Sequence, residues 1–217
     1  MLEIHSITTG PFQENCHILQ DPDTKEIVVV DPGDDAPELV DFLKRIGGRV
    51  TAIWNTHAHI DHIGANAAVK RATGAPISIH EAEKDWLGSA MLCGAALFGI
   101  PFEPSKADVL WKDGDVVTAL GREWRVHHAP GHSPGMCTIS CDAERLIIVG
   151  DLIMMNSIGR TDLPGGDDRA MAKSLKEFFA YAKPDWQILS GHGGRSLVRQ
   201  EIQLNHNARY MIEEFGA

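Results

Sequence analysis

The order of the predicted secondary structure is the feature that most constrains the fold of this 217-residue chain. Short β-type runs come first and are followed by a helix, a strand, a loop and a second helix, and a similar order returns in the second half. Two β-rich halves with helices outside them predict a layered α/β sandwich in which the loops at the strand ends can meet. The length favours a single domain over residues 1–217.

Apolar periodicity and turn residues place the individual elements. The β-type runs cover residues 2–8, 16–21, 26–33, 50–55, 76–80, 109–120, 122–129, 136–141, 145–151 and 186–191. The predicted helices cover residues 36–48, 63–73, 169–182 and 197–214. The segment 81–105 has no clean period, and we expect either a short helix with an apolar loop over a pocket or a helical connection packed on the core.

The charge balance and the cysteines argue against several kinds of function. Lysine plus arginine number 20 against 30 for aspartate plus glutamate, which gives a net charge of −10, and no basic run offers a surface for nucleic acid. The N-terminus lacks the features of a signal peptide and no apolar stretch of about 18 residues is present, so we expect a cytoplasmic protein that does not enter a membrane. The four cysteines lack C-x-x-C spacing and are expected to be free, buried thiols.

The stretch NTHAHIDHIGAN, residues 55–66, is the strongest functional signal. It directly follows a predicted strand and places four metal-binding side chains within six residues, namely His57, His59, Asp61 and His62. Histidine and aspartate bind zinc or iron strongly, and residues two apart in an extended segment share a side. A turn into a helix at Asp61 would direct Asp61 and His62 away from the first pair, so the stretch can serve two adjacent ions.

Three further donors occur where other predicted strands end. His132 lies in HHAPGHSPG, Asp151 in LIIVGD and His192 in ILSGHGG. Loops at strand ends are where α/β folds build their sites, so we expect all seven donors to converge. Seven donors are too many for one tetrahedral ion and suit two ions that share a bridging carboxylate. The predicted ligands are His57, His59 and His132 for one ion, Asp61, His62 and His192 for the other, and Asp151 as the bridge.

Taken together, THAHIDH, APGHSPG, GD and GHGG resemble, in this order, the metal-ligand motifs of the metallo-β-lactamase-fold hydrolases. The match runs through nearly the whole chain, and FQENCHIL, VVVDPG and NSIGRTDLPGGD resemble the short glyoxalase II-like hydrolases in particular. The resemblance implies an αββα sandwich, with two mixed sheets flanked by helices and a dinuclear site in the cleft between the sheets. It also implies two divalent metal ions, with zinc expected first and iron or manganese as the alternatives.

The implied activity is metal-dependent hydrolysis of a small-molecule thioester or ester, and hydroxyacylglutathione is the leading candidate. In the family a metal-bridging hydroxide attacks the substrate carbonyl, because a bound cation can lower the pKa of water from about 15.7 to near 7. Asp61 and Asp151 are then catalytic carboxylates as well as metal ligands. Only 25 residues follow His192, so the glutathione contacts of the longer glyoxalase II enzymes are not carried over.

Persulfide dioxygenases are the main alternative, because they share this fold and a similar GRTD segment. The resemblance to them implies one iron at His57, His132 and Asp151, and two histidines with one carboxylate suit oxygen chemistry. Metal content and oxygen uptake distinguish the two activities. The sequence leaves the oligomeric state and the metal used in the cell open.

Two residues outside the donor set have predicted roles. Asp31, at the end of the strand in VVVDPG, is expected either to orient a ligating histidine or to form a turn. Arg160, in IGRTD, is expected either to bind an anionic group of the substrate or to pair with a neighbouring aspartate. The remaining histidines share none of these loop contexts and are expected on the surface or in strands, at positions 5, 17, 80, 127, 128 and 206.

Overall fold

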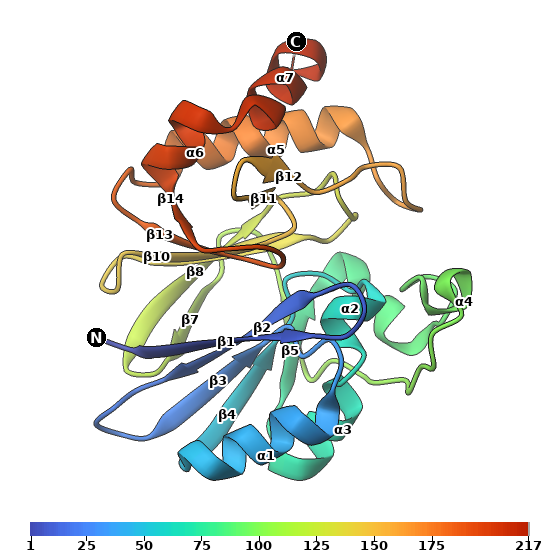
Figure 1. Cartoon of the computed structure of the whole chain (residues 1–217), viewed down its shortest axis with the longest axis vertical. Helices are drawn as coiled ribbons and strands as arrows, with labels where there is room; N and C mark the ends of the chain where they lie inside the picture. Colours follow the sequence, from blue (N-terminus) through green and yellow to red (C-terminus); the bar gives the residue numbers. More distant parts are fainter. Residues whose placement is uncertain (217) are drawn as a thin grey trace. The chain divides into compact units, whose positions relative to one another are not determined.

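The computed structural model describes residues 1–216 and contains two compact units (Figure 1). The first unit consists of Met1–Trp111 and Thr118–Arg122, and the second consists of Lys112–Val117 and the chain from Glu123 onward. Within the described residues, twelve of the fourteen strands form two six-stranded sheets, each of which mixes parallel and antiparallel pairs, and the other two strands form a separate hairpin. The predicted fold class, with two mixed sheets flanked by helices, is confirmed. The single domain over residues 1–217 stays a prediction.

The first sheet follows the order of the chain. Its strands are β1 (Glu3–Thr9), β2 (Glu14–Gln20), β3 (Glu26–Val30), β4 (Arg49–Trp54), β5 (Ile77–His80) and β6 (Val109–Trp111). The pairs from β1 to β3 are antiparallel, and the pairs from β3 to β6 are parallel. Val30 and Trp54, the last residues of β3 and β4, are partners in the register. The residues that follow them therefore leave the sheet side by side, at the edge where parallel strands build sites.

Two helices of the first unit, α1 (Ala36–Ile46) and α3 (Asn66–Thr73), pack on this sheet. Leu39 and Leu43 of α1 and Val69 of α3 belong to one buried cluster with apolar side chains of the strands. That cluster includes Ile18, Ile27, Val29, Ile53, Ile77 and Ile79. Each such side chain contributes about 1.5–3 kcal/mol when fully buried, so the cluster fixes the helices against the strands.

The predicted helix 63–73 is wrong at its beginning, because the chain forms two helices there. A short helix, α2 (Ile60–Ile63), comes first, and α3 begins at Asn66. The N–H of Ala65 donates to the carbonyl of Pro32 at 2.9 Å, in the loop that follows β3. Gly64 permits this approach, because a Cβ at this position would lie 2.3 Å from the carbonyl oxygen of Gly33. A tertiary contact therefore interrupts a pattern that is continuous in the sequence.

The segment 81–105 forms short turns rather than one helix. It contains two 3₁₀ turns, Glu81–Glu83 and Trp86–Gly88, and a four-residue helix, α4 (Ala95–Phe98). Its buried apolar side chains, Trp86, Leu87, Cys93 and Ala95, belong to the same cluster as the strands. Its large exposed apolar side chains are Met91, Leu92, Leu97 and Phe98. The segment thus combines packing on the core with an exposed apolar surface, and both expectations hold in part.

The second sheet has the order β14–β13–β10–β9–β8–β7. These strands are β7 (Val116–Ala119), β8 (Arg122–His128), β9 (Cys137–Cys141), β10 (Leu146–Gly150), β13 (Gln187–Ser190) and β14 (Ser196–Leu197). β10 pairs parallel with β13, and Gly150 is the partner of Ser190. Asp151 and the loop with His192 therefore leave the sheet at the same edge. The predicted run 109–120 is divided, because β6 belongs to the first sheet and β7 to the second.

Three helices pack in the second unit, namely α5 (Asp168–Tyr181), α6 (Val198–Leu204) and α7 (His206–Phe215). The single helix predicted over 197–214 is wrong, because Asn205 interrupts it. The Asn205 side chain accepts from Ala208 N at 2.9 Å, which begins α7, and donates to the carbonyl of Ser157 at 2.8 Å. Ser157 lies in a two-stranded hairpin, β11 (Ile153–Met154) and β12 (Ser157–Ile158), which the sequence did not predict.

Two simpler predictions concern the cysteines and the membrane. All four cysteines are free and buried, as predicted. Within residues 1–216, none of the helices combines the length and the apolar composition needed to cross a bilayer. The cytoplasmic location stays a prediction.

The turn between β2 and β3 gives a testable pH dependence. Asp21 accepts from Thr24 N at 2.8 Å and pairs with the Arg122 guanidinium. The Thr24 backbone bond, followed by the contact with Arg122, lowers the pKa of Asp21 to about 2. Because the unfolded value is about 3.9, the resulting stabilisation is complete above about pH 4 and is lost as the pH falls through 2.

We expect Asp21→Asn to lower the free energy of unfolding at pH 5–7, with a difference from wild type that shrinks between pH 4 and pH 2. Urea unfolding in the presence of a chelator measures this difference. Asp23→Asn, which removes a carboxylate from the same turn, is the matched control and should show no such convergence. Parallel pH curves for wild type and Asp21→Asn would contradict the assignment.

Candidate metal centre

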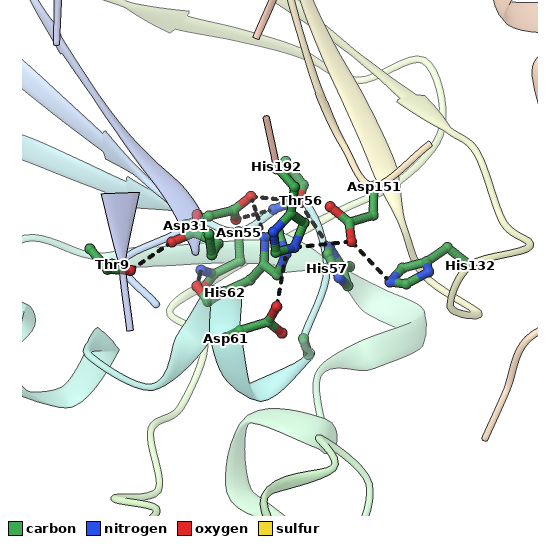
Figure 2. A network of polar contacts seen from close by, with 12 residues as sticks. Thr9, Asp31, Asn55, Thr56, His57, Asp61, His62, His132, Asp151 and His192 are labelled. Atoms are coloured by element: carbon green, nitrogen blue, oxygen red, sulfur yellow. Dashed lines mark hydrogen bonds and ion pairs between the residues drawn. The ribbon is translucent and has the colours of Figure 1, made fainter. Parts of the chain in front are cut away.

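The first unit brings four predicted donors, His57, His59, Asp61 and His62, to the region where the chain passes from β4 to α2. Figure 2 labels three of them, His57, Asp61 and His62. The ring centroids of His57 and His59 are 4.9 Å apart, and those of His57 and His62 are 4.0 Å apart. His62 Nε2 lies 3.8 Å from Asp61 Oδ2. His59 keeps an extended backbone and is followed directly by the helix, so the predicted turn into a helix occurs one residue earlier than expected, at Ile60.

Asp31 and Thr56 fix the orientation of two of these rings. Asp31 Oδ1 accepts from Thr56 N at 2.7 Å, and Oδ2 accepts from Thr56 Oγ1 at 2.6 Å. Asp31 Oδ2 also lies 3.1 Å from His62 Nδ1, and Thr56 Oγ1 lies 3.1 Å from His57 Nδ1. An ionised carboxylate only accepts, so His62 donates through Nδ1, and the Thr56 hydroxyl, which gives its proton to Asp31, accepts from His57 Nδ1. Both rings therefore offer Nε2 as the metal-binding atom. The predicted contact between Asp31 and a histidine ring is confirmed, and metal binding by that ring stays a prediction.

Asn55 and Glu83 support the same loop and were not found from the sequence. Asn55 Nδ2 donates to the His62 carbonyl at 3.2 Å, and Asn55 and Asn66 exchange amide hydrogen bonds. Glu83 Oε2 accepts from Ala58 N, between the first two histidines, at 2.6 Å. Asn55 begins the histidine-rich stretch, and this position was the available signal for it, whereas Glu83 lies 25 residues from its partner Ala58.

A close backbone approach positions Asp61. A Cβ at Gly33 would lie 1.5 Å from the carbonyl oxygen of Asp61, so only glycine allows the loop after β3 to reach the first turn of α2. The VVVDPG motif thus has two roles: its aspartate orients His62, and its glycine leaves room for the helix that carries Asp61.

The second unit groups the other three predicted donors, His132, Asp151 and His192 (Figure 2). Asp151 Oδ2 lies 3.5 Å from His132 Nε2 and 3.5 Å from His192 Nε2. The carbonyl of Arg160 lies 2.7 Å from His132 Nδ1, and because a carbonyl only accepts, this ring also offers Nε2. Asp151 Oδ2 thus contacts both imidazoles, and the bridging role of Asp151 stays a prediction.

Gly159 permits this arrangement. A Cβ at Gly159 would lie 2.0 Å from the Asp151 carbonyl oxygen and 3.0 Å from His132 Nδ1. The glycine of IGRTD therefore lets the chain pass against both donors while Arg160 presents its carbonyl to His132. This role of Gly159 was not predicted from the sequence, which indicated a role only for Arg160 of the same motif.

The Arg160 side chain pairs with Asp162, which is one of the two alternatives predicted for it. Arg160 Nε lies 2.6 Å from Asp162 Oδ1, and Nη2 lies 2.7 Å from Oδ2. This contact raises the pKa of Arg160 and lowers the pKa of Asp162 to about 2. The Arg160 side chain is 57% exposed. Its binding of an anionic substrate group stays a prediction.

The residues present fit a transition metal. Imidazoles and carboxylates without thiolates suit zinc, iron or manganese, and hydrogen bonds to the distal ring nitrogen are typical partners of metal-binding histidines. The first unit supplies four donors and the second unit three. Their assembly into a centre with two ions stays a prediction.

Removing one acceptor oxygen from Asp31 tests the orientation of His62. We expect Asp31→Asn, which keeps the size and tolerates the positive φ of 49°, to lower the affinity for zinc by about 10–100-fold. Competition with a chromophoric chelator measures this affinity. Asp41→Asn, on the exposed side of α1, changes the charge equally and should leave the affinity unchanged. An Asp31→Asn protein that binds zinc as wild type does would refute the role.

A methyl group at Gly159 tests the packing of the second donor group. We expect Gly159→Ala to lower the free energy of unfolding by about 1–3 kcal/mol, because a backbone carbonyl must move, and to weaken zinc binding. Urea unfolding and chelator competition measure the two effects. Gly88→Ala adds the same methyl group where no atom lies within 4 Å and should change stability by less than about 0.5 kcal/mol. Equal behaviour of the two variants would contradict the packing argument.

Curated proteins similar to this chain include two with printed functions. One is "Probable metallo-hydrolase YqgX" of Bacillus subtilis, 34% identical over 90% of this chain and 92% of the relative. The other is "Hydroxyacylglutathione hydrolase GloC" of Haemophilus influenzae, 28% identical over 94% of this chain and 97% of the relative.

Solved structures agree with the fold. BLEG-1, described as a B3 metallo-beta-lactamase, superposes with a TM-score of 0.90 at 36% identity, over 94% of this chain and 98% of its own. TTHA1623 in a di-iron-bound form superposes with a TM-score of 0.83 at 30% identity, over 93% and 98% of the two chains. The family model of the metallo-beta-lactamase superfamily matches residues 9–192, a span that contains every predicted donor. The chain therefore belongs to the metallo-β-lactamase superfamily and has the histidine and aspartate donors of a metal-dependent hydrolase.

Proposed function

We propose that the chain hydrolyses small thioesters or esters with two divalent ions, and that its activity is similar to that of glyoxalase II. The observation that carries this proposal is the common orientation of His57, His62 and His132, whose Nδ1 atoms all contact acceptors of the protein. Each ring thereby offers Nε2 to a cation in the neutral form that metal binding needs. We further propose that the donors of both units hold the two ions together, with Asp151 as the bridge.

The chain's own residues have distinct tasks in this proposal. Two bound divalent ions supply a Lewis acid for the substrate carbonyl and a water whose pKa is lowered to near 7. Asp31 and Thr56 hold His57 and His62 in one tautomer, and the Arg160 carbonyl does the same for His132. Asp61 and Asp151 bring negative charge that offsets the charge of the ions.

Cys16 and Cys93 do not offer a competing nucleophile. Burial raises the pKa of Cys16 well above its ordinary value, and Glu14 and Asp31 raise it further. Burial also raises the pKa of the Cys93 thiol. The thiolate is the reactive form of cysteine, so neither residue is prepared for attack on a carbonyl.

The relatives suggest which substrates to test first. The printed name of GloC, at 28% identity, supports S-lactoylglutathione as the first substrate. The printed name of BLEG-1, at 36% identity, favours β-lactam hydrolysis as a second candidate. The di-iron form of TTHA1623, at 30% identity, supports iron as an alternative to zinc.

Elemental analysis of protein purified without added metal, combined with turnover assays, tests the function. We expect about two zinc, iron or manganese ions per chain, turnover of S-lactoylglutathione and no thiol-dependent oxygen uptake. His59→Ala and His62→Ala should each reduce kcat/KM by more than about 100-fold, since the loss of a ligand exceeds the loss of its hydrogen-bond partner. His206→Ala, an exposed histidine at the beginning of α7, is the matched control and should keep full activity.

Three outcomes would refute the proposal. One iron with persulfide-dependent oxygen consumption would identify a dioxygenase. Nitrocefin turnover that exceeds thioester turnover would identify a β-lactamase. Full thioester turnover by the His59→Ala and His62→Ala double variant without metal would rule out the metal mechanism.

A further inference from the structure

A small cavity of about 40 Å³ lies beside Asp61, entirely within the first unit. Its apolar lining comes from Pro11, Phe12, Ile60, Ile100 and Pro101. Three separate segments supply these residues: the turn between β1 and β2, the beginning of α2 and the chain after α4. Asp61 is a predicted metal donor and also part of the cavity wall, so the cavity borders the donor group of the first unit.

The size of the cavity limits what it can hold. One water-sized group needs roughly 10–15 Å³ of such a cavity, so a volume of about 40 Å³ accommodates roughly three such groups. A chain of two or three carbon atoms matches this volume, whereas a chain of eight carbon atoms exceeds it.

Phe12 forms an exposed side of the cavity. Its ring contacts the ring of Phe98 in α4 edge to face, with a centroid distance of 5.1 Å and an interplanar angle of 69°. Phe12 is 38% exposed and Phe98 is 43% exposed, so both residues are at the surface. Removing the Phe12 ring would therefore extend the cavity toward solvent without opening the buried cluster of the unit.

The charge of the lining is negative. Asp34 and Asp61 both line the cavity, and none of its lining residues is lysine, arginine or histidine. Asp34 is held in place, because its Oδ1 accepts from Asp35 N at 2.7 Å and its own N–H donates to Thr9 Oγ1 at 3.2 Å. A carboxylate in the acyl chain would meet the Asp34 carboxylate, and the cavity lining offers it no cationic side chain.

We propose that this cavity receives the acyl chain of the substrate and selects a short, uncharged chain. The proposal rests on the proposed thioester or ester hydrolysis and adds the class of acyl group to it. Phe12 and Ile100 set the length limit, and Asp34 excludes an acidic acyl group. These three residues are specificity determinants, and the metal donors are unchanged by their substitution.

The length limit is tested with N-acetylcysteamine thioesters of propanoate and octanoate. The wild-type protein should prefer the propanoyl substrate, and Phe12→Ala and Ile100→Ala should each raise the octanoyl to propanoyl ratio of kcat/KM about tenfold or more. Leu97→Ala, an exposed apolar residue of α4 that does not line the cavity, is the matched control and should keep the wild-type ratio. Unchanged ratios in both cavity variants would overturn the proposal.

The charge limit is tested with succinyl and butanoyl thioesters, which have the same chain length. Asp34→Asn keeps an acceptor oxygen for Asp35 N and should raise the succinyl to butanoyl ratio of kcat/KM roughly tenfold. Asp41→Asn, on the exposed side of α1, removes the same charge elsewhere and should leave the ratio unchanged. Equal ratios in wild type and Asp34→Asn would overturn the exclusion of acidic chains.

A binding measurement separates this inference from the proposed function. The zinc-loaded full chain, labelled at the isoleucine methyl groups, is titrated with the hydrolysis-resistant thioethers S-propyl- and S-octyl-N-acetylcysteamine. We expect the propyl compound to shift the NMR signals of Ile60 and Ile100, with a larger effect than the octyl compound. If the thioethers cause these shifts but the protein hydrolyses none of the thioester substrates, the proposed function is refuted and the cavity assignment is supported. If the protein hydrolyses the thioesters but the thioethers cause no such shifts, the cavity assignment is refuted and the proposed function is supported.

Discussion

The hydrogen bonds of the Asp31 carboxylate are the interaction on which the donor group of the first unit depends. Its two oxygens accept from the backbone and the hydroxyl of Thr56 and contact the imidazole of His62. This is possible because β3 and β4 are parallel and in register, so the residue after β3 lies next to the loop after β4. Asp31 adopts a φ of 49°, a conformation that aspartate tolerates better than most residues. Backbone geometry and hydrogen bonding therefore require the same residue type at this position.

The sequence predicted the donors because their pattern is local, whereas the residues that orient them are distant. Four donors lie within six consecutive residues, and each of the others follows an apolar strand. The contacts from Asp31 to Thr56 and to His62 span 25 and 31 residues, and that from His132 to Arg160 spans 28. Asp31 was proposed for such a contact, but Thr56 and the Arg160 carbonyl were not, since a hydroxyl and a backbone oxygen have no sequence pattern.

The errors in the predicted helices have the same origin. The helical pattern of residues 63–73 and of residues 197–214 is continuous in the sequence. In the structure, the carbonyl of Pro32 accepts a hydrogen bond from Ala65 N and interrupts the first, and Asn205 binds to a distant hairpin and interrupts the second. The roles of Gly33 and Gly159 are the hardest to predict from the sequence, because these roles depend on the absence of a side chain. At both positions a Cβ would overlap the backbone of a donor residue, and a glycine in a sequence does not say which segment approaches it.

Apart from Ile60, Asp61 and Gly64, the walls of the Asp61 cavity come from other segments of the first unit than the metal donors. The donors follow β4, whereas the cavity is completed by a hairpin turn at residues 9–12 and by the chain after α4. Surface segments of this kind accept substitutions and insertions more readily than strands and their hydrogen-bonded ends. A descendant of this chain can therefore acquire new substrates through changes in two exposed segments while its reaction chemistry stays intact, which is how one scaffold comes to serve many activities.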